Sequence, residues 1–245
     1  MPGVSVDELL EREWLFVGGM PRTGTALCQH LLNLHPDCHI IGEVSFEVCL
    51  LKAFRPGITP NQVTAVFRNT IGEVARYPWG MSRIWEDPEE DDALDWVRRM
   101  MAGARSRYPD ALVWGARNNI YGHHWEQLRK LFPNCKIIVM DRDVEEVVES
   151  ILACDWWLED PCPPETQADE REVWFTRRRH STRGAVLQVR ELMRPCPGAK
   201  WVQLAELNAS PREVITDLLS WVGLRADTYP WDVAMARFVE GARIN

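Results

Sequence analysis

Short apolar runs recur along this chain, and each is followed by a polar turn and then by apolar residues at helical spacing. The clearest run covers residues 135–140, CKIIVM, and it precedes a polar turn at 141–143 and a helical stretch at 144–151. Runs of this kind are typical of strands buried on both faces of a parallel sheet. Further strands are expected at residues 14–17, 39–41, 111–114 and 200–204. The repetition predicts a three-layer α/β/α fold with a central, mostly parallel sheet of about four to five strands.

Helical periodicity and turn residues place helices between these strands. Besides the stretch at 144–151, helices are expected at residues 5–13, 44–55, 61–76, 93–107, 123–131, 168–193, 211–222 and 230–240. Two irregular segments, 78–92 and 155–167, are expected to be surface loops. Because a chain of 245 residues can bury one large core, we expect a single domain over residues 1–245.

The first strand leads into a turn that is suited to binding an anion. Gly18-Gly19 end the apolar run, and PRTGT at residues 21–25 precedes a helical pattern of leucines. Backbone N–H groups at the start of a helix lack intrahelical partners, and the helix dipole adds partial positive charge there. Glycines let the backbone approach the anion closely. The sequence therefore predicts a P-loop-like strand, phosphate-sized loop and helix.

This loop differs from the loop of nucleoside-triphosphate-binding proteins. Gly19 and Gly24 have the spacing of the first half of GxxxxGK[ST], but Thr25 stands where that motif has lysine. The only cation of the loop, Arg22, lies inside it rather than at the helix start. The loop alone is compatible with several kinds of nucleotide-binding protein.

A second candidate site consists of Arg142, at the end of the clearest strand, and Ser150, two turns into the following helix. Ligands of open α/β sheets sit at the carboxyl ends of the strands, so both side chains are expected to face the same crevice as the first loop. Arginine offers two parallel donors to a phosphate, and serine adds a hydroxyl. The alternative is an arginine paired with Asp141 or Asp143 and a solvated serine.

Together, these segments resemble the two nucleotide signatures of sulfotransferases that use 3′-phosphoadenosine 5′-phosphosulfate (PAPS). PRTGT resembles the loop that holds the 5′-phosphosulfate, and KIIVMDRDVEEVVES, residues 136–150, resembles the segment in which arginine and serine hold the 3′-phosphate. The segment 201–222 resembles the family's C-terminal pattern. The pattern is most similar to the protein-tyrosine sulfotransferases and related bacterial proteins, where an HPD-like turn leads to Gly-Glu, as HPD at 35–37 leads to Gly42-Glu43 here.

The resemblance implies a set of site residues. Those that would bind PAPS, or its product 3′-phosphoadenosine 5′-phosphate (PAP), are Pro21, Arg22, Thr23, Gly24, Thr25, Ala26, Arg142 and Ser150. Three residues would be catalytic. Arg22 would stabilise charge on the sulfuryl group and the leaving 5′-phosphate, and Glu43 would be the general base for the acceptor hydroxyl. The alternative for Glu43 is a solvent-facing cap of the helix at 44–55.

The third catalytic residue implied by the resemblance is Arg117. It falls where the tyrosine-sulfotransferase branch carries a lysine that contacts the sulfuryl group, which is the main departure from the family pattern. Arginine keeps the positive charge of lysine, but its guanidinium is a planar group with several fixed N–H donors, whereas lysine presents one compact ammonium group. Asn118 and Asn119 are expected to orient it.

Two further groups of residues are interpreted through the same resemblance. The tryptophans of the two irregular segments, Trp79, Trp85, Trp156 and Trp157, are expected to recognise the acceptor, since an exposed aromatic side chain favours a pocket or an interface. The helix at 168–193 carries Arg171, Arg177, Arg178, Arg179 and Arg183. These arginines are expected either to reach the nucleotide phosphates or to pair with Glu165–Glu172.

The function implied is transfer of a sulfuryl group from PAPS to a hydroxyl of a small-molecule or peptide acceptor, without a metal. Two alternatives remain open at this point. One is a nucleotide-dependent kinase or other phosphoryl transferase with a degenerate loop. The other is a protein that binds an adenine nucleotide without turnover.

Composition and charge narrow the expected partners. No apolar run approaches the ~20 residues of a membrane span, and residues 1–8 lack the features of a signal peptide. Seven scattered cysteines without a CxxC pair indicate reduced thiols in a cytoplasmic protein. The cysteines and histidines between 28 and 39 are too scattered around the helix for a zinc site. A net charge of −8 argues against nucleic acid as a partner.

Overall fold

The computed structural model describes residues 11–42, 110–122, 124–154 and 168–239, together with Glu8, Arg105 and Tyr108. Several predictions lie outside these residues. They concern the helices at 44–55 and 61–76, both irregular segments with their tryptophans, Glu43, and the helix at 93–107 except for Arg105, which is helical.

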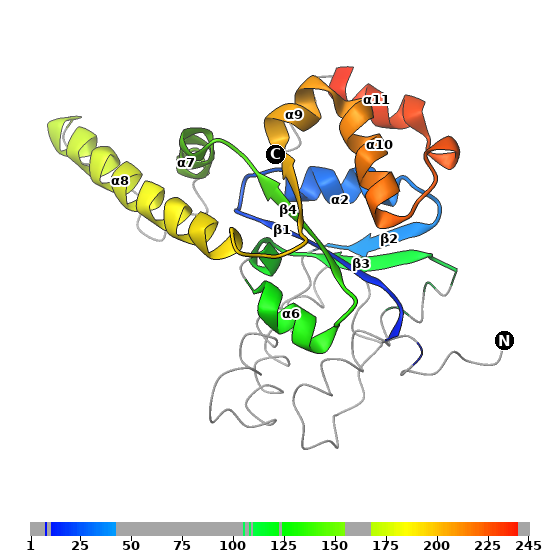
Figure 1. Ribbon diagram of the computed structural model, residues 1–245. Coiled ribbons are helices and arrows are strands. Elements are labelled where there is room, and N and C mark those ends of the chain that lie inside the picture. The colour runs from blue at the N-terminus through cyan, green and yellow to red at the C-terminus, as the bar shows by residue number, and fades with distance from the viewer. Residues whose placement is uncertain are drawn as a thin grey trace, which may run out of the picture.

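Five strands form one parallel sheet (Figure 1). They are β1 (Trp14–Gly19), β2 (Cys38–Ile41), β3 (Val113–Arg117), β4 (Lys136–Asp141) and β5 (Lys200–Gln203). Their order is β2-β3-β1-β4-β5, and every neighbouring pair is parallel. β1 is central, with Phe16 opposite Ala116 of β3 and Ile137 of β4. The predicted parallel sheet is confirmed.

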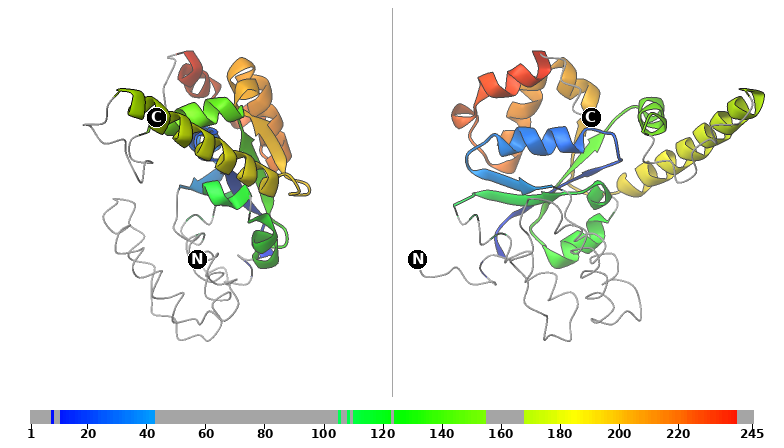
Figure 2. Two further views of the ribbon diagram at one scale, coloured as in Figure 1. Left: turned by 90° about the vertical axis from the view of Figure 1, so that its left-hand side faces the viewer. Right: turned by 180° about the vertical axis from the view of Figure 1, so that it is seen from behind.

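Helices cover both faces of this sheet (Figures 1 and 2). They are α2 (Thr25–Asn33), α6 (Trp125–Leu131), α7 (Val144–Leu152), α8 (Ala168–Met193), α9 (Leu204–Ala209), α10 (Pro211–Val222) and α11 (Trp231–Val239), with 3₁₀ turns η2 (Asn119–Gly122) and η4 (Ala226–Thr228). α2, α9, α10 and α11 lie over one face, and α6 lies over the other. α8 packs beside α7 and projects away from the sheet. This arrangement confirms the predicted α/β/α layers.

Alternate residues of β1 build the core on its two faces, because successive side chains of a strand point in opposite directions. Leu15 and Val17 belong to the aliphatic core beneath α2 and α10. Trp14 and Phe16 face the other way, where the ring of Phe132 lies 4.5 Å from that of Trp14 and the ring of Tyr121 lies 5.1 Å from that of Phe16. Both faces of the central strand are therefore fully buried, as its continuous apolar sequence requires.

Two boundaries differ from the sequence-based expectation. β3 begins at Val113 and continues through Gly115, which we interpreted as the end of the strand. A Cβ atom at position 115 would clash with the carbonyl oxygen of Leu15, so this glycine permits the close approach of β1 and β3. After β5, the residues around Glu206 form the short helix α9, with Leu207 fully buried. None of the helices in the described residues is long and apolar enough to cross a lipid bilayer.

Candidate functional site

The candidate site lies where the loops after β1 and β4 leave the sheet. These strands are neighbours, and Gly19 at the end of β1 lies opposite Met140 of β4. The chain leaves β1 toward α2 and the β2 side of the sheet, whereas it leaves β4 toward α7 and the β5 side (Figure 1). A crevice opens where such connections diverge, and this is the usual ligand position in open α/β sheets.

The loop between β1 and α2 is a tight turn held by its own residues. Gly19 has φ 146° and Gly24 has φ 92°, conformations that L side chains rarely adopt. A Cβ at Gly19 would clash with the carbonyl oxygen of Met140, and one at Gly24 would lie 2.8 Å from Leu204 Cδ1. The Thr23 hydroxyl donates to the carbonyl oxygen of Met20 at 2.6 Å. The backbone of this loop therefore has little room to change shape.

The start of α2 has no side-chain cap within the described part of the chain. Gly24 is the residue that precedes the helix, and no described side chain accepts a hydrogen bond there from the first turn of α2. The N–H groups of the first turn therefore remain available as donors at the positive end of the helix dipole.

Arg22 joins the two segments that were predicted to bind one nucleotide. Its Nε atom donates to Ser150 Oγ at 2.9 Å, and its carbonyl oxygen accepts from Arg142 Nη1 at 3.2 Å. Arg22 itself adopts φ 69°, the left-handed region that is uncommon for a residue with a Cβ. Two arginines and a serine hydroxyl thus form a single group of donors between the two loops.

The alternative pairing of Arg142 with Asp141 or Asp143 is wrong. Arg142 Nε donates to Glu146 one turn along α7, at 2.8 Å. Asp143 caps α7, because its side chain accepts from the backbone N–H groups of Glu145 and Glu146. The Asp141 carboxylate is buried and has other partners.

Those partners come from two further elements. Asp141 Oδ2 accepts from Arg190 of α8 at 2.6 Å and from Gln203 of β5 at 2.8 Å. This ion pair ties the carboxyl ends of β4 and β5 to α8, directly beside Arg142. The sequence did not reveal it, because Arg190 lies 49 positions from Asp141 and carries no local signal.

Arg117, at the end of β3, lies beside α2. Its Nε atom donates to Gln29 Oε1 at 2.9 Å, and Gln29 Nε2 donates in turn to the carbonyl oxygen of Ile40. A Cβ at Gly42 would lie 3.5 Å from Arg117 Nη2, so the chain passes this guanidinium immediately before residue 43. Gln29 is a partner that sequence reasoning missed. Asn119 accepts from Thr25 Oγ1 at 3.1 Å and so fixes the start of α2.

Two arginines of α8, Arg179 and Arg183, have partners on α7 that neither sequence-based alternative named. Arg179 pairs with Glu145 and Glu149 at 3.3 and 2.8 Å, and Arg183 pairs with Glu145 at 2.6 Å. The hydrogen bond from Arg183 is the main reason that the pKa of the Glu145 carboxyl lies below its ordinary value. These exposed pairs hold α8 against α7, the helix that carries Ser150.

The cysteine and histidine positions near α2 have the character of core residues. Burial raises the pKa values of the Cys28 and Cys38 thiols to about 12, which favours the neutral thiol of a buried core residue. His35 is buried and bonds the carbonyl oxygen of Arg225 and the hydroxyl of Thr228. Among the described residues, no three histidine, cysteine or acidic side chains are grouped as metal ligands.

Comparison with known proteins adds independent findings. The profile of the sulfotransferase family matches residues 15–228. A putative protein-tyrosine sulfotransferase of Caenorhabditis briggsae is 27% identical over 140 residues, which are 56% of this chain and 42% of that protein. The match therefore spans less than half the length of this curated relative.

Two solved structures share the fold. The sulfotransferase from Alicyclobacillus acidocaldarius has a TM-score of 0.52 and 17% identity, covering 88% of this chain and 83% of its own. The sulfotransferase domain from the curacin biosynthetic pathway has a TM-score of 0.54 and 14% identity. The similarity covers 87% of this chain and 75% of that domain. At such low identity these similarities concern the fold alone. Because the family profile spans most of the chain, from β1 to the turn before α11, this protein belongs to the sulfotransferase family.

Proposed function

We propose that this protein transfers a sulfuryl group from PAPS to a hydroxyl group of a small molecule or peptide. Membership of the sulfotransferase family supports the reaction class. The observation that carries the assignment to this site is the contact of Arg22 with both Ser150 and Arg142, which unites the loop after β1 with the start of α7.

The residues present fit a nucleotide with phosphates at two positions. The crowded glycines and the uncapped start of α2 suit a 5′-phosphosulfate that must approach the backbone closely. Arg142 and Ser150 supply a guanidinium and a hydroxyl for a 3′-phosphate on the β4 side of the loop. Pro21, Thr23, Thr25 and Ala26 complete the proposed nucleotide-binding loop.

The side chains of this chain would act in three ways during transfer. PAPS would supply the sulfuryl group, which bonds to the acceptor oxygen as its bond to the nucleotide breaks. Arg22 would hold positive charge in the loop, where negative charge grows on the leaving 5′-phosphate. Glu43 would accept the hydroxyl proton of the acceptor as a general base.

Arg117 would hold a second positive charge on the other side of α2. Its guanidinium is fixed by Gln29 and adjoins Gly42, the residue that Glu43 follows in the chain. A guanidinium at this position would offer two parallel N–H donors to the sulfuryl oxygens while the bond to the nucleotide breaks. We therefore assign Arg117 to stabilising the sulfuryl charge.

Calorimetry with PAP, ADP and ATP, each with and without magnesium, tests the nucleotide assignment. We expect PAP to bind at least tenfold more tightly than ADP without metal, because a lost charge-assisted contact costs ~1.5–3 kcal/mol. Incubation with radiolabelled PAPS and a pool of phenols, sugars and tyrosine peptides then tests turnover. Tighter binding of ATP with magnesium would indicate a phosphoryl transferase, and PAP binding without any sulfated product would indicate a non-catalytic protein.

We also propose that the protein acts in the cytoplasm and that residues 1–245 form one domain. The five cysteines among the described residues form no disulfide, and four of them are buried, which supports a reducing compartment. Cell fractionation tests the location. Limited proteolysis tests the single domain, which predicts no stable fragment of about half size.

A further inference from the structure

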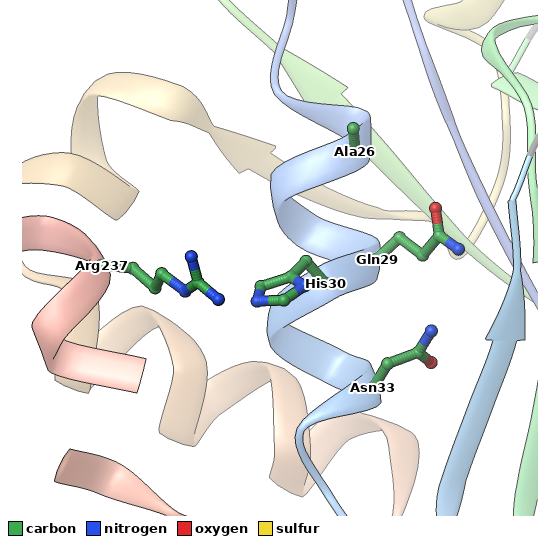
Figure 3. A pocket seen from close by; sticks show the side chains of 5 residues that line it. All are labelled: Ala26, Gln29, His30, Asn33 and Arg237. Carbon is green, nitrogen blue, oxygen red and sulfur yellow. The ribbon is translucent and has the colours of Figure 1, made fainter. Parts of the chain in front are cut away.

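A pocket of about 340 Å³ lies on the flank of α2, away from the loop at the start of that helix. Ala26, Gln29, His30, Asn33 and Arg237 line it. Figure 3 shows the guanidinium of Arg237, on α11, and the imidazole of His30, on α2, pointing toward each other. Only Ala26 is shared with the proposed nucleotide-binding loop, so this pocket is a different feature from that loop.

Two of its polar side chains have their hydrogen bonds made elsewhere. Gln29 donates to the carbonyl oxygen of Ile40 and accepts from Arg117. Asn33 donates to the same oxygen at 2.8 Å and accepts from the Ile40 N–H at 2.7 Å. Both amides are therefore held against β2 and form a fixed wall of the pocket.

The other two polar side chains, His30 and Arg237, can still accept new hydrogen-bond or ion-pair partners. His30 Nε2 is buried and has no hydrogen-bond partner among the described residues. Burial first, and then the nearby charge of Arg237, lower the pKa of His30, so the ring is neutral at neutral pH. Within the same part of the chain, no carboxylate lies within ion-pair distance of Arg237. A buried nitrogen without a partner is uncommon and favours a ligand at this position.

We propose that this pocket binds a small organic carboxylate between Arg237 and His30. One guanidinium compensates one negative charge, and its planar fork matches the two oxygens of a carboxylate. A neutral imidazole adds a single N–H donor, and the Ala26 methyl group contacts the organic part of the ligand. A sulfate or phosphate dianion would keep an uncompensated charge here. The volume is close to the lower limit of ~300 Å³ for small-molecule sites, so the ligand is compact.

The carboxylate belongs either to a separate small molecule or to the acceptor itself. Gln29 lines this pocket and also accepts the hydrogen bond from Arg117, so an occupant would touch a residue that positions a proposed catalytic side chain. The binding chemistry is the same for both sources. The proposal itself stands without the sulfuryl-transfer assignment, because it rests on the α2 and α11 side chains alone.

Proton NMR of the histidine rings, during titration with sodium benzoate at constant ionic strength, tests the binding. The His30 signal is assigned by its loss in a His30→Gln variant. We expect a saturable shift of this signal in the wild type and at least tenfold weaker binding in Arg237→Gln, since a charge-assisted contact is lost. Arg194→Gln is the matched control, because Arg194 directly follows α8, is exposed and pairs with Glu191 of that helix, so benzoate affinity stays unchanged.

Three results would overturn the proposal. They are a shift that does not saturate, an equal response to sodium sulfate, and equal weakening by Arg194→Gln and Arg237→Gln. Circular dichroism of each variant excludes loss of the fold as the cause. These measurements need no turnover, so their failure is separate from failure of the sulfotransferase assignment.

A second experiment distinguishes the two sources of the carboxylate. It compares 4-hydroxyphenylacetate with 4-methylphenol as acceptors. If the acceptor supplies the carboxylate, Arg237→Gln raises KM for 4-hydroxyphenylacetate but not for 4-methylphenol, and benzoate competes with 4-hydroxyphenylacetate. If a separate molecule supplies it, Arg237→Gln leaves the ratio of the two KM values unchanged, and benzoate binds the wild type without competing with either acceptor.

Discussion

Arg22 Nε donates a hydrogen bond to Ser150 Oγ across 2.9 Å, although 128 positions separate the two residues in the chain. The same arginine accepts a hydrogen bond from Arg142 through its carbonyl oxygen. One short loop therefore places a cation where two distant segments meet, and its backbone is held in a left-handed conformation to do so. The functional consequences of this arrangement can be measured residue by residue.

The first prediction concerns recognition of the 3′-phosphate. Arg142→Ala should weaken PAP binding at least tenfold and leave ADP binding nearly unchanged, because only PAP carries the group that Arg142 would contact. Ser150→Ala should have a smaller effect in the same direction, about 1 kcal/mol for one neutral donor. Calorimetry with both nucleotides measures the difference. Equal weakening of PAP and ADP would remove Arg142 from the 3′-phosphate site.

The second prediction concerns the general base. Glu43→Gln should leave PAP affinity intact and lower turnover roughly a hundredfold or more, as expected when a base is replaced by a neutral isostere. Steady-state kinetics with the best acceptor, together with PAP calorimetry, separate these two effects. Unchanged turnover would show that Glu43 is not the base and would favour the alternative of a helix cap.

The third prediction concerns the shape of the anion loop. Gly19→Ala should destabilise the fold by about 1–3 kcal/mol, because the new Cβ meets the Met140 carbonyl at a strained φ of 146°. Gly184→Ala is the matched control, since nothing lies within 4 Å of a Cβ there. This substitution should stabilise α8 by about 1 kcal/mol. Urea denaturation measures the free energy of unfolding of both variants. An unchanged value for Gly19→Ala would contradict the crowding of the loop around Gly19.

The fourth prediction concerns alkaline pH. Burial raises the pKa of Cys28 and Cys38 from 9.0 to about 12. Above about pH 9 the unfolded chain loses these protons while the folded chain keeps them, so the free energy of unfolding falls as pH rises. The stabilisation is complete below the unfolded pKa, and each thiol contributes a slope of about 1.4 kcal/mol per pH unit above it.

Urea denaturation between about pH 8 and pH 10 measures that slope. A Cys28→Ala, Cys38→Ala double variant is less stable throughout, because it leaves a cavity, but its stability should fall less steeply with pH. Parallel curves for the wild type and the double variant would show that these thiols do not titrate differently in the two states.

The sequence predicted the elements well where local signals are strong. Residues 137–140 are apolar enough to form a strand buried on both faces, and α8 occupies its predicted range because helix-forming residues run through it without a proline, so that the single Gly184 does not end it. Gly115 misled the interpretation. A glycine usually ends a strand, but here it lies within β3 because β1 passes too close for any side chain.

The candidate site was only partly predictable, for a related reason. The pattern along a chain indicates which segments reach one edge of a sheet, and it placed Arg22, Arg142 and Ser150 together. It does not indicate which polar side chains then pair across elements. Gln29 as the partner of Arg117, and Arg190 as the partner of Asp141, depend on how α2 and α8 pack, and no local sequence signal carries that information.

The central position of β1 also determines when the site can assemble during synthesis. β1 leaves the ribosome before both of its hydrogen-bonded neighbours, β3 and β4, which lie about a hundred residues further along the chain. At ~5–20 residues per second, the interval between Arg22 and Ser150 lasts on the order of ten seconds. During this time the first strand has neither of its two sheet neighbours to pair with. Nucleotide can therefore stabilise only a late stage of folding, after the polypeptide has grown past α7.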